Sequence, residues 1–260
     1  MHRPFLLIST PRSGSDWFAA ECLLWRTPEY FREYFNPTCN FHHAAVLSQA
    51  FGSEVDWANL AVPWECQEIS CEYIHSITWA REAWRCTKEN YAAFKIGFFR
   101  RHFDCFALIG HRWNTFPGGS RPRSTEYWWD RIYRSLEFNR HLLDEDIARL
   151  VDHATAGRVS LNRKMIAAQV IATYQTVREC LKYEIPILEY RRLISLPSTS
   201  EIFEYLADKL PAPLREGGLA DRILSTRRAV DKAIPYEAWD VEGLAVELID
   251  LMPTEIRPYF

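Results

Sequence analysis

The chain has 260 residues, 48% of them apolar and 25% charged, a composition typical of folded globular proteins and not of disordered ones. Lysine and arginine total 31 against 34 aspartate and glutamate, so the net charge of −3 gives no reason to expect binding to nucleic acid or to an anionic membrane. The N-terminal apolar run is too short for a signal peptide, no stretch reaches the roughly 20 apolar residues of a membrane span, and seven scattered cysteines predict reduced thiols in the cytoplasm.

Predicted strands and helices alternate along the chain. Residues 5–9 form a continuous apolar run that predicts a buried strand, and a polar turn and a helix over 16–26 follow. Further strands are predicted at 93–99, 105–111 and 185–190, and helices at 158–183 and, opened by a capping box, at 198–210. This order predicts an α/β protein of three α/β/α layers around a mostly parallel central sheet, in one domain over 1–260.

Two segments, 38–81 and 115–157, do not fit strands of such a sheet. They are rich in Trp, Tyr and His, and we interpret them as helical, aromatic excursions over the carboxyl edge of the sheet. Ligands of open α/β sheets bind at that edge, so these excursions are predicted to form the acceptor side of a site.

The loop after the first strand is a candidate anion site. A strand that turns sharply into a helix directs several backbone N–H groups and the positive end of the helix dipole at one point, a combination that favours phosphate. Here the loop adds Arg12 and the hydroxyls of Ser13 and Ser15, and Gly14 lets the backbone approach an anion closely. The Gly-x-x-x-x-Gly-Lys-Ser/Thr pattern of nucleoside-triphosphate P-loops is missing.

Residues 9–17, Ser-Thr-Pro-Arg-Ser-Gly-Ser-Asp-Trp, resemble the 5′-phosphosulfate loop of sulfotransferases that use 3′-phosphoadenosine 5′-phosphosulfate (PAPS). The resemblance implies a P-loop NTPase-like sulfotransferase fold and PAPS as co-substrate without a metal. It also implies a donor-binding loop in which Arg12 meets the leaving oxygen during transfer. The residues assigned to this loop are Arg12, Ser13, Gly14, Ser15, Asp16 and Trp17.

The second half of that family's signature is an Arg at a strand end with a Ser eight residues later. Here the strand predicted at 105–111 is followed by Arg112, and Ser120 stands eight residues on. The resemblance implies that both hold the 3′-phosphate of the nucleotide, Arg112 through a charge-assisted contact. Residues 187–193 resemble the family's late scaffolding strand. The basic run Arg222, Arg227, Arg228 and Lys232 is either a further clamp on this phosphate or, as we favour, a solvated helix face.

Two positions depart from the family pattern. Asp16 stands where the family usually has Thr or Ser, and its carboxylate would repel a phosphate unless it turns outward, which we favour. Lys95 is followed by Ile96 and not by the histidine that many cytosolic relatives have, so a histidine base at that position is absent here.

The acceptor needs a group that takes its proton, and Glu33 is the first candidate. It lies in a Glu-Tyr-Phe segment that resembles one carrying the base in several bacterial and carbohydrate sulfotransferases, although Glu29 competes for the alignment. His42, next to His43, is the second candidate. This histidine pair has no third ligand at a suitable spacing, so no metal site is predicted, and His102 is expected to be solvated.

The sequence therefore predicts a cytoplasmic sulfotransferase that acts on a small-molecule, carbohydrate or other hydroxyl (or amine) acceptor, with no nucleic-acid or membrane partner. Two alternatives remain open. One is a small-molecule kinase on a P-loop-like fold, which the missing loop lysine disfavours. The other is a non-catalytic nucleotide-binding descendant, which Asp16 and the missing histidine after Lys95 suggest.

Overall fold

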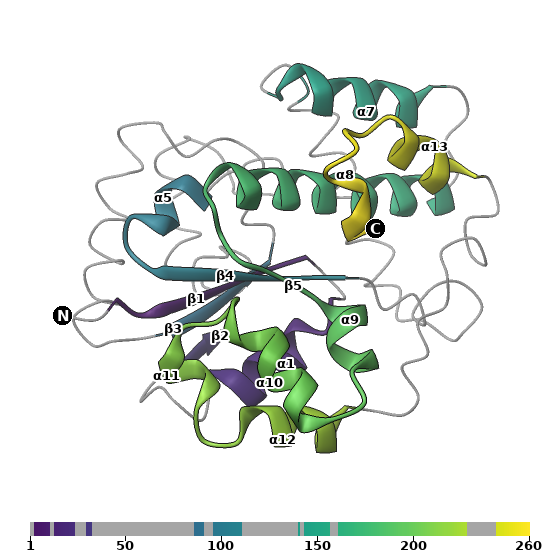
Figure 1. Cartoon of the computed structure of the whole chain (residues 1–260). Helices are drawn as coiled ribbons and strands as arrows, with labels where there is room; N and C mark the ends of the chain where they lie inside the picture. The colour runs from purple at the N-terminus through teal and green to yellow at the C-terminus, as the bar shows by residue number, and fades with distance from the viewer. Residues whose placement is uncertain are drawn as a thin grey trace.

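A parallel five-stranded sheet lies at the centre of the fold (Figure 1). The computed structural model of the chain describes residues 3–10, 13–23, 30–32, 86–90, 96–110, 140, 143–156, 161–227 and 243–260. The strand order is β2-β3-β1-β4-β5, and every pairing between neighbours is parallel. The strands are β1 (Phe5–Ser9), β2 (Tyr30–Arg32), β3 (Cys86–Asn90), β4 (Asp104–Ile109) and β5 (Ile187–Glu189).

Helices cover both faces of the sheet and make it the middle of three layers (Figure 1). One face carries α5 and α8, with α7 and α13 packed on the outer side of α8, and the other carries α1, α9, α10, α11 and α12. The helices are α1 (Ser15–Cys22), α5 (Ile96–Arg100), α7 (Glu145–Thr155), α8 (Leu161–Lys182), α9 (Tyr190–Ser195), α10 (Thr199–Ala207), α11 (Ala212–Arg215), α12 (Leu219–Thr226) and α13 (Leu244–Asp250), and a 3₁₀ turn covers Arg257–Tyr259.

The alternation of side chains along β1 divides the core into two clusters, one under each helical layer. Leu6 and Ile8 contribute to the cluster that contains α8, whereas Phe5 and Leu7 contribute to the cluster that contains α1 and α10. All five residues of β1 are buried, as expected of a central strand covered on both faces.

Most predicted elements are confirmed with shifted ends. The strand over 5–9 is β1, that over 105–111 is β4, and that over 185–190 shortens to β5. The helix over 158–183 is α8, and the capping box opens α10, where the Ser198 hydroxyl accepts a hydrogen bond from the Glu201 amide. The segment 38–81 lies outside the described residues, and of 115–157 the described part contains the helix α7.

The strand predicted at 93–99 is wrong. Residues 96–100 form the helix α5, in which Ile96 and Phe99 are three residues apart and both are fully buried. A short apolar run does not distinguish a buried strand from a buried helical turn, and here the helical spacing decides. The strand beside β1 is instead β3. Its Lys88 and Glu89 are buried, although charged residues are expected at the surface of a protein.

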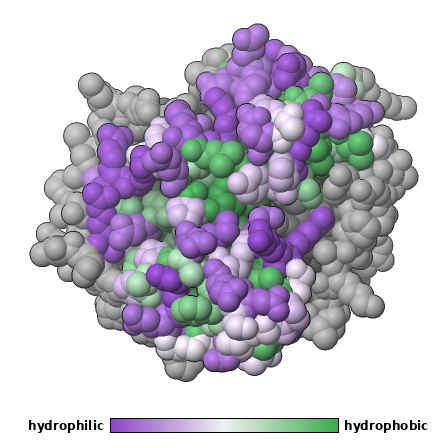
Figure 2. Space-filling view, viewed as in Figure 1, coloured by the Kyte–Doolittle hydropathy of each residue, from purple (hydrophilic) through white to green (hydrophobic). Residues whose placement is uncertain are grey.

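Hydrophilic side chains cover most of the described surface in this view, with smaller apolar patches between them (Figure 2). The large apolar side chains most exposed among the described residues are Leu181, Phe203 and Val246. Within the described ranges, no helix has the length and apolar character needed to cross a membrane.

Candidate functional site

The strand order predicts a ligand-binding crevice at the carboxyl ends of β1 and β4. These strands are hydrogen-bonded neighbours, but the chain leaves β1 toward β2 on one side of the sheet and leaves β4 toward β5 on the other. In open α/β sheets such a reversal of direction separates the two outgoing connections and leaves room for a ligand. Thr10 follows β1 and Gly110 follows β4, so both begin their loops at this crevice.

The loop after β1 turns the chain directly into α1. The Ser13 amide donates to the Thr10 carbonyl at 3.2 Å, and Gly14 then takes a left-handed conformation, with φ 78° and ψ 12°, before the first helical residue. Residues other than glycine adopt that conformation only at a cost of about 1 kcal/mol or more, so the sharp entry into the helix depends on Gly14. Pro11 and Arg12 lie outside the described residues.

Two hydroxyl groups of this loop are buried and lack a hydrogen-bond partner. The Thr10 side chain is 1% exposed and that of Ser13 is fully buried, and neither Oγ has a partner among the residues that the structure describes. A buried hydroxyl without a partner is unfavourable, and such groups in native proteins often belong to a site that a ligand completes. The N-terminus of α1 adds its positive dipole end at the same place, so the geometry suits an anion.

Strand β3 contributes a buried polar cluster beside this loop. The ammonium of Lys88, which has no exposed surface, donates to Oδ1 of Asp16 at 2.9 Å, and the Asp16 side chain is 57% exposed. The Ser9 hydroxyl donates to Oδ1 of Asn90 at 2.6 Å, and the buried Glu89 carboxylate accepts from the Thr87 hydroxyl at 2.7 Å. The strand predicted at 93–99 begins seven residues after the start of β3, so this cluster was not predicted from the sequence.

Tyr190 closes the crevice from the side of β5. It is 2% exposed, and its atoms occupy the space in which side chains at Gly14 and Gly110 would stand. The indole of Trp17 meets the ring of Tyr190 edge-on at 6.1 Å, and its Nε1 donates to the Thr226 hydroxyl at 2.9 Å. The half-buried Trp17 therefore ties α1 to α12, and its ring nitrogen already has a partner in the protein.

Of the residues predicted to hold the donor, the structure describes Ser13, Gly14, Ser15, Asp16 and Trp17. It brings them together in one turn, with Ser13 and Ser15 buried and the partly exposed Asp16 carboxylate bonded to the buried Lys88. The other predicted site residues lie outside the described residues: Arg12, Glu29, Glu33, His42, His43, Arg112 and Ser120.

Two further interpretations concern residues away from the loop. His102 precedes β4, at the opposite edge of the sheet from the crevice, and is half-buried where a solvated side chain was expected. In the late basic run, Arg222 donates to the Glu21 carbonyl at 2.8 Å, and Arg227 donates to the Ile194 carbonyl at 3.0 Å. These two side chains bind the backbone of neighbouring segments, whereas Arg228 and Lys232 lie outside the described residues.

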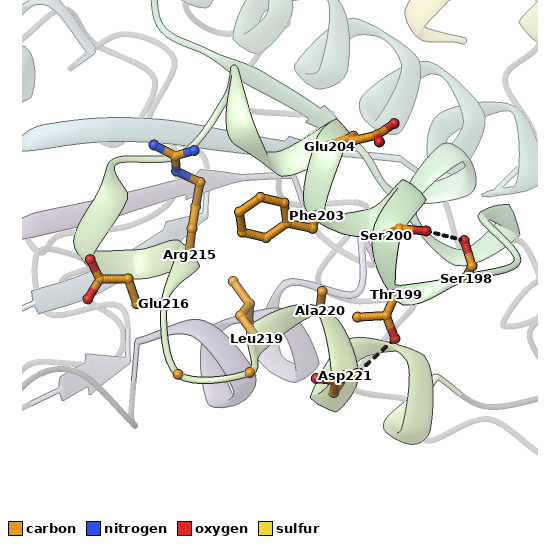
Figure 3. Close-up of a pocket in the computed structure, with 12 residues that line it drawn as sticks. Ser198, Thr199, Ser200, Phe203, Glu204, Arg215, Glu216, Leu219, Ala220 and Asp221 are labelled. Atoms are coloured by element: carbon orange, nitrogen blue, oxygen red, sulfur yellow. Dashed lines mark hydrogen bonds between the residues drawn. The ribbon is translucent and has the colours of Figure 1, made fainter.

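The described residues also form two open hollows away from the crevice. One of about 710 Å³ lies between α10, α11 and α12, where Phe203, Leu219 and Ala220 form an apolar wall and Thr199 donates to Asp221 at 2.8 Å (Figure 3). The other, of about 540 Å³, lies at the amino edge of the sheet between Arg3, Arg100 and Glu184. Neither contains a residue predicted to bind the donor.

The described side chains offer no candidate metal centre, since no group of three or more His, Cys, Asp or Glu among them is arranged around a common point. The thiols of Cys105 and Cys180 are held protonated, because burial raises the pKa of each well above its usual range. Neither is therefore an activated nucleophile.

Comparison of the chain with protein families, curated proteins and solved structures finds no match. The loop and the sequence that forms it are therefore the features that bear on function.

Proposed function

We propose that this chain is a sulfotransferase that moves a sulfuryl group from PAPS to a hydroxyl or amine acceptor, on a P-loop-like sulfotransferase fold. The observation that carries the proposal is the turn from β1 into α1. It combines the left-handed Gly14, the buried hydroxyls of Thr10 and Ser13, which have no partner among the described residues, and a helix N-terminus at the carboxyl ends of β1 and β4. The sequence of this turn also resembles the 5′-phosphosulfate loop.

The roles of the residues follow from the charge that develops in the reaction. The acceptor oxygen attacks sulfur while the bond from sulfur to the 5′-phosphate oxygen breaks, so negative charge builds on the leaving 3′-phosphoadenosine 5′-phosphate. Ser13, Gly14, Ser15 and the start of α1 would stabilise that charge, and Arg12, which stays protonated, would meet the leaving oxygen. Catalysis of this kind depends mostly on positioning and electrostatics.

The remaining roles are assigned by sequence alone. Arg112, three residues after the end of β4, and Ser120 would hold the 3′-phosphate. Glu33, directly after the end of β2, would take the proton of the acceptor, with His42 as the second candidate. Acceptors of the hydroxyl class, among them carbohydrates and small molecules, are consistent with these roles.

Calorimetric titration tests the donor site. We expect 3′-phosphoadenosine 5′-phosphate to bind with micromolar affinity, about −8 kcal/mol, and adenosine 5′-monophosphate to bind at least tenfold more weakly. Arg112→Ala is expected to abolish that preference, whereas Arg149→Ala, an exposed arginine on α7, serves as the matched control and keeps it.

Two outcomes would contradict the proposal. Equal affinity for the two nucleotides would show that the protein has no site for the 3′-phosphate. Binding of Mg-ATP that is tighter than binding of the bisphosphate would favour the small-molecule kinase. If the bisphosphate binds, transfer from PAPS to a panel of hydroxyl acceptors follows. Binding without transfer to any acceptor would favour the non-catalytic alternative.

A further inference from the structure

The ion pair between Lys88 and Asp16 is asymmetric. The lysine side chain has no exposed surface, whereas the aspartate side chain is 57% exposed, and Nζ lies 2.9 Å from Oδ1. An ammonium removed from water is costly unless an anion compensates it, so the buried member depends on the pair more than the exposed one does.

The pair connects the sheet to the loop that enters α1. Lys88 lies in β3, in register with Leu7 of the neighbouring strand β1, and Asp16 lies in the first turn of α1, two residues after Gly14. A lysine of the sheet thus holds a carboxylate in the first turn of α1. The backbone amides of that same turn are the groups that would face a bound anion. The contact spans 72 residues of sequence and depends on the correct register of β3 against β1.

The charge of Asp16 explains why such a contact matters. A carboxylate in the first turn of a helix interacts favourably with the helix dipole, and it repels any phosphate bound at the same turn. With the Lys88 ammonium at 2.9 Å, the positive charge of the lysine offsets that of the carboxylate, which is directed toward β3. The anion-binding loop therefore tolerates an acidic residue where relatives of the resembled family carry Thr or Ser.

We infer that Lys88 is a positioning residue of the loop site, which acts through Asp16 by neutralising this carboxylate and holding it away from the 5′-phosphate. The inference rests on the proposed function. It assigns to Lys88 a contribution specific to the 5′-phosphate end of the nucleotide and none at the 3′-phosphate end.

A double-mutant cycle tests this inference. Lys88→Met replaces the lysine with an apolar side chain of similar length, and the Asp16 carboxylate that remains is already in contact with water, so the variant is expected to fold. Adenosine 3′,5′-bisphosphate and adenosine 3′-monophosphate are titrated into the wild type, Lys88→Met, Asp16→Asn and the double variant. Lys182→Met, which removes a lysine that is 57% exposed at the end of α8, controls for net charge.

We expect Lys88→Met to weaken binding of the bisphosphate at least tenfold and to leave that of the 3′-monophosphate within twofold. The double variant is expected to return to within threefold of the wild type, because the carboxylate that Lys88 would neutralise is gone. Asp16→Asn is expected to bind the bisphosphate at least as tightly as the wild type does. Lys182→Met is expected to bind it with the affinity of the wild type. If the ion pair were purely structural, Lys88→Met would weaken the binding of both nucleotides alike. The double variant would then bind the bisphosphate as weakly as Lys88→Met does.

Other outcomes overturn the inference in distinguishable ways. If the wild type does not bind the bisphosphate, both the proposed function and this inference fail. The inference alone fails in two cases in which the wild type binds the bisphosphate. In one, the effects of the two substitutions on affinity are additive; in the other, binding of the 3′-monophosphate weakens as much as binding of the bisphosphate. Should Lys88→Met not fold by circular dichroism, Lys88→Gln, which keeps a donor for Asp16 but removes the charge, is judged against the same outcomes.

Discussion

The ring of Tyr190 occupies the space that a side chain on Gly14 would need: a Cβ on Gly14 would lie 2.4 Å from Cε2 of Tyr190. Atoms at that distance overlap, so any residue larger than glycine must displace a ring that is 2% exposed. The conformation of the loop and the packing of α9 are therefore coupled. The same tyrosine approaches Gly110, where a Cβ would lie 2.6 Å from the Cβ of Tyr190.

Gly14→Ala is expected to destabilise the protein by more than its backbone conformation alone would. The left-handed conformation costs an alanine about 1–2 kcal/mol, and the overlap with Tyr190 adds to this cost. Gly243→Ala is the matched control, because Gly243 has a similar φ of 69° and no atom of the described residues lies within 4 Å of the added Cβ. Urea unfolding measures both variants, and equal losses would show that Tyr190 yields without cost.

Ser13→Ala is expected to separate stability from binding. Its hydroxyl is buried without a partner among the described residues, so removing it should leave the free energy of unfolding unchanged or raise it by up to about 1–2 kcal/mol. If the hydroxyl contacts the 5′-phosphate, affinity for 3′-phosphoadenosine 5′-phosphate should fall about tenfold. Ser225→Ala on α12, a serine exposed at the surface, should change neither quantity. A clear loss of stability in Ser13→Ala would instead point to a structural role.

Tyr205→Phe is expected to cost about 1–2 kcal/mol of stability, because it leaves the Glu189 amide without its acceptor. That amide donates to the Tyr205 hydroxyl at 2.7 Å, where β5 ends and α9 begins, and burial raises the pKa of Tyr205 to about 12. Tyr259→Phe is the control, since the hydroxyl of this half-buried tyrosine has no hydrogen bond within the described chain. Thermal unfolding of both variants measures the difference, and equal midpoints would contradict the prediction.

Cys180 is expected to resist alkylation as the pH rises. Burial raises the pKa of its thiol far above the value of about 8.5 that a free cysteine has, so the native protein keeps the proton that the unfolded chain loses. The unfolded state then binds fewer protons, and stability should decline above about pH 8.5. Peptide mapping after iodoacetamide treatment at pH 7.5 and 9.5 should find Cys180 unmodified until denaturant is added. Cys180→Ala should show a shallower decline in stability between pH 8 and 10.

Periodicity and local signals were sufficient to predict β1, β4, β5, α8 and α10. Each has a continuous apolar run bounded by breakers, a three-and-four spacing of apolar residues, or a capping signal, and these features depend on nearby sequence alone. The turn at Gly14 was also predictable, since the order strand, glycine-containing loop and helix is local.

Strand β3 could not be predicted in the same way. Its buried Lys88 donates to Asp16, which lies 72 residues away in sequence, and its buried Glu89 accepts a hydrogen bond from Thr87. A single-sequence pattern assigns charged residues to the surface and has no means of finding such a partner. The contacts of Tyr190 with Gly14 and of Lys88 with Asp16 join segments that are distant in sequence, and they are visible only in three dimensions.

The central place of β1 has a consequence for how the chain folds. Its partners β3 and β4 begin 81 and 99 residues after it, so the strand that carries the loop is completed only by contacts of long sequence separation. Closing such large loops is slow, and parallel sheets formed in this way fold more slowly than helical proteins of similar size. During synthesis, the first 100 residues would expose β1 without its second neighbour. We expect a ribosome-released fragment ending near residue 100 to be prone to aggregation and unable to bind nucleotide.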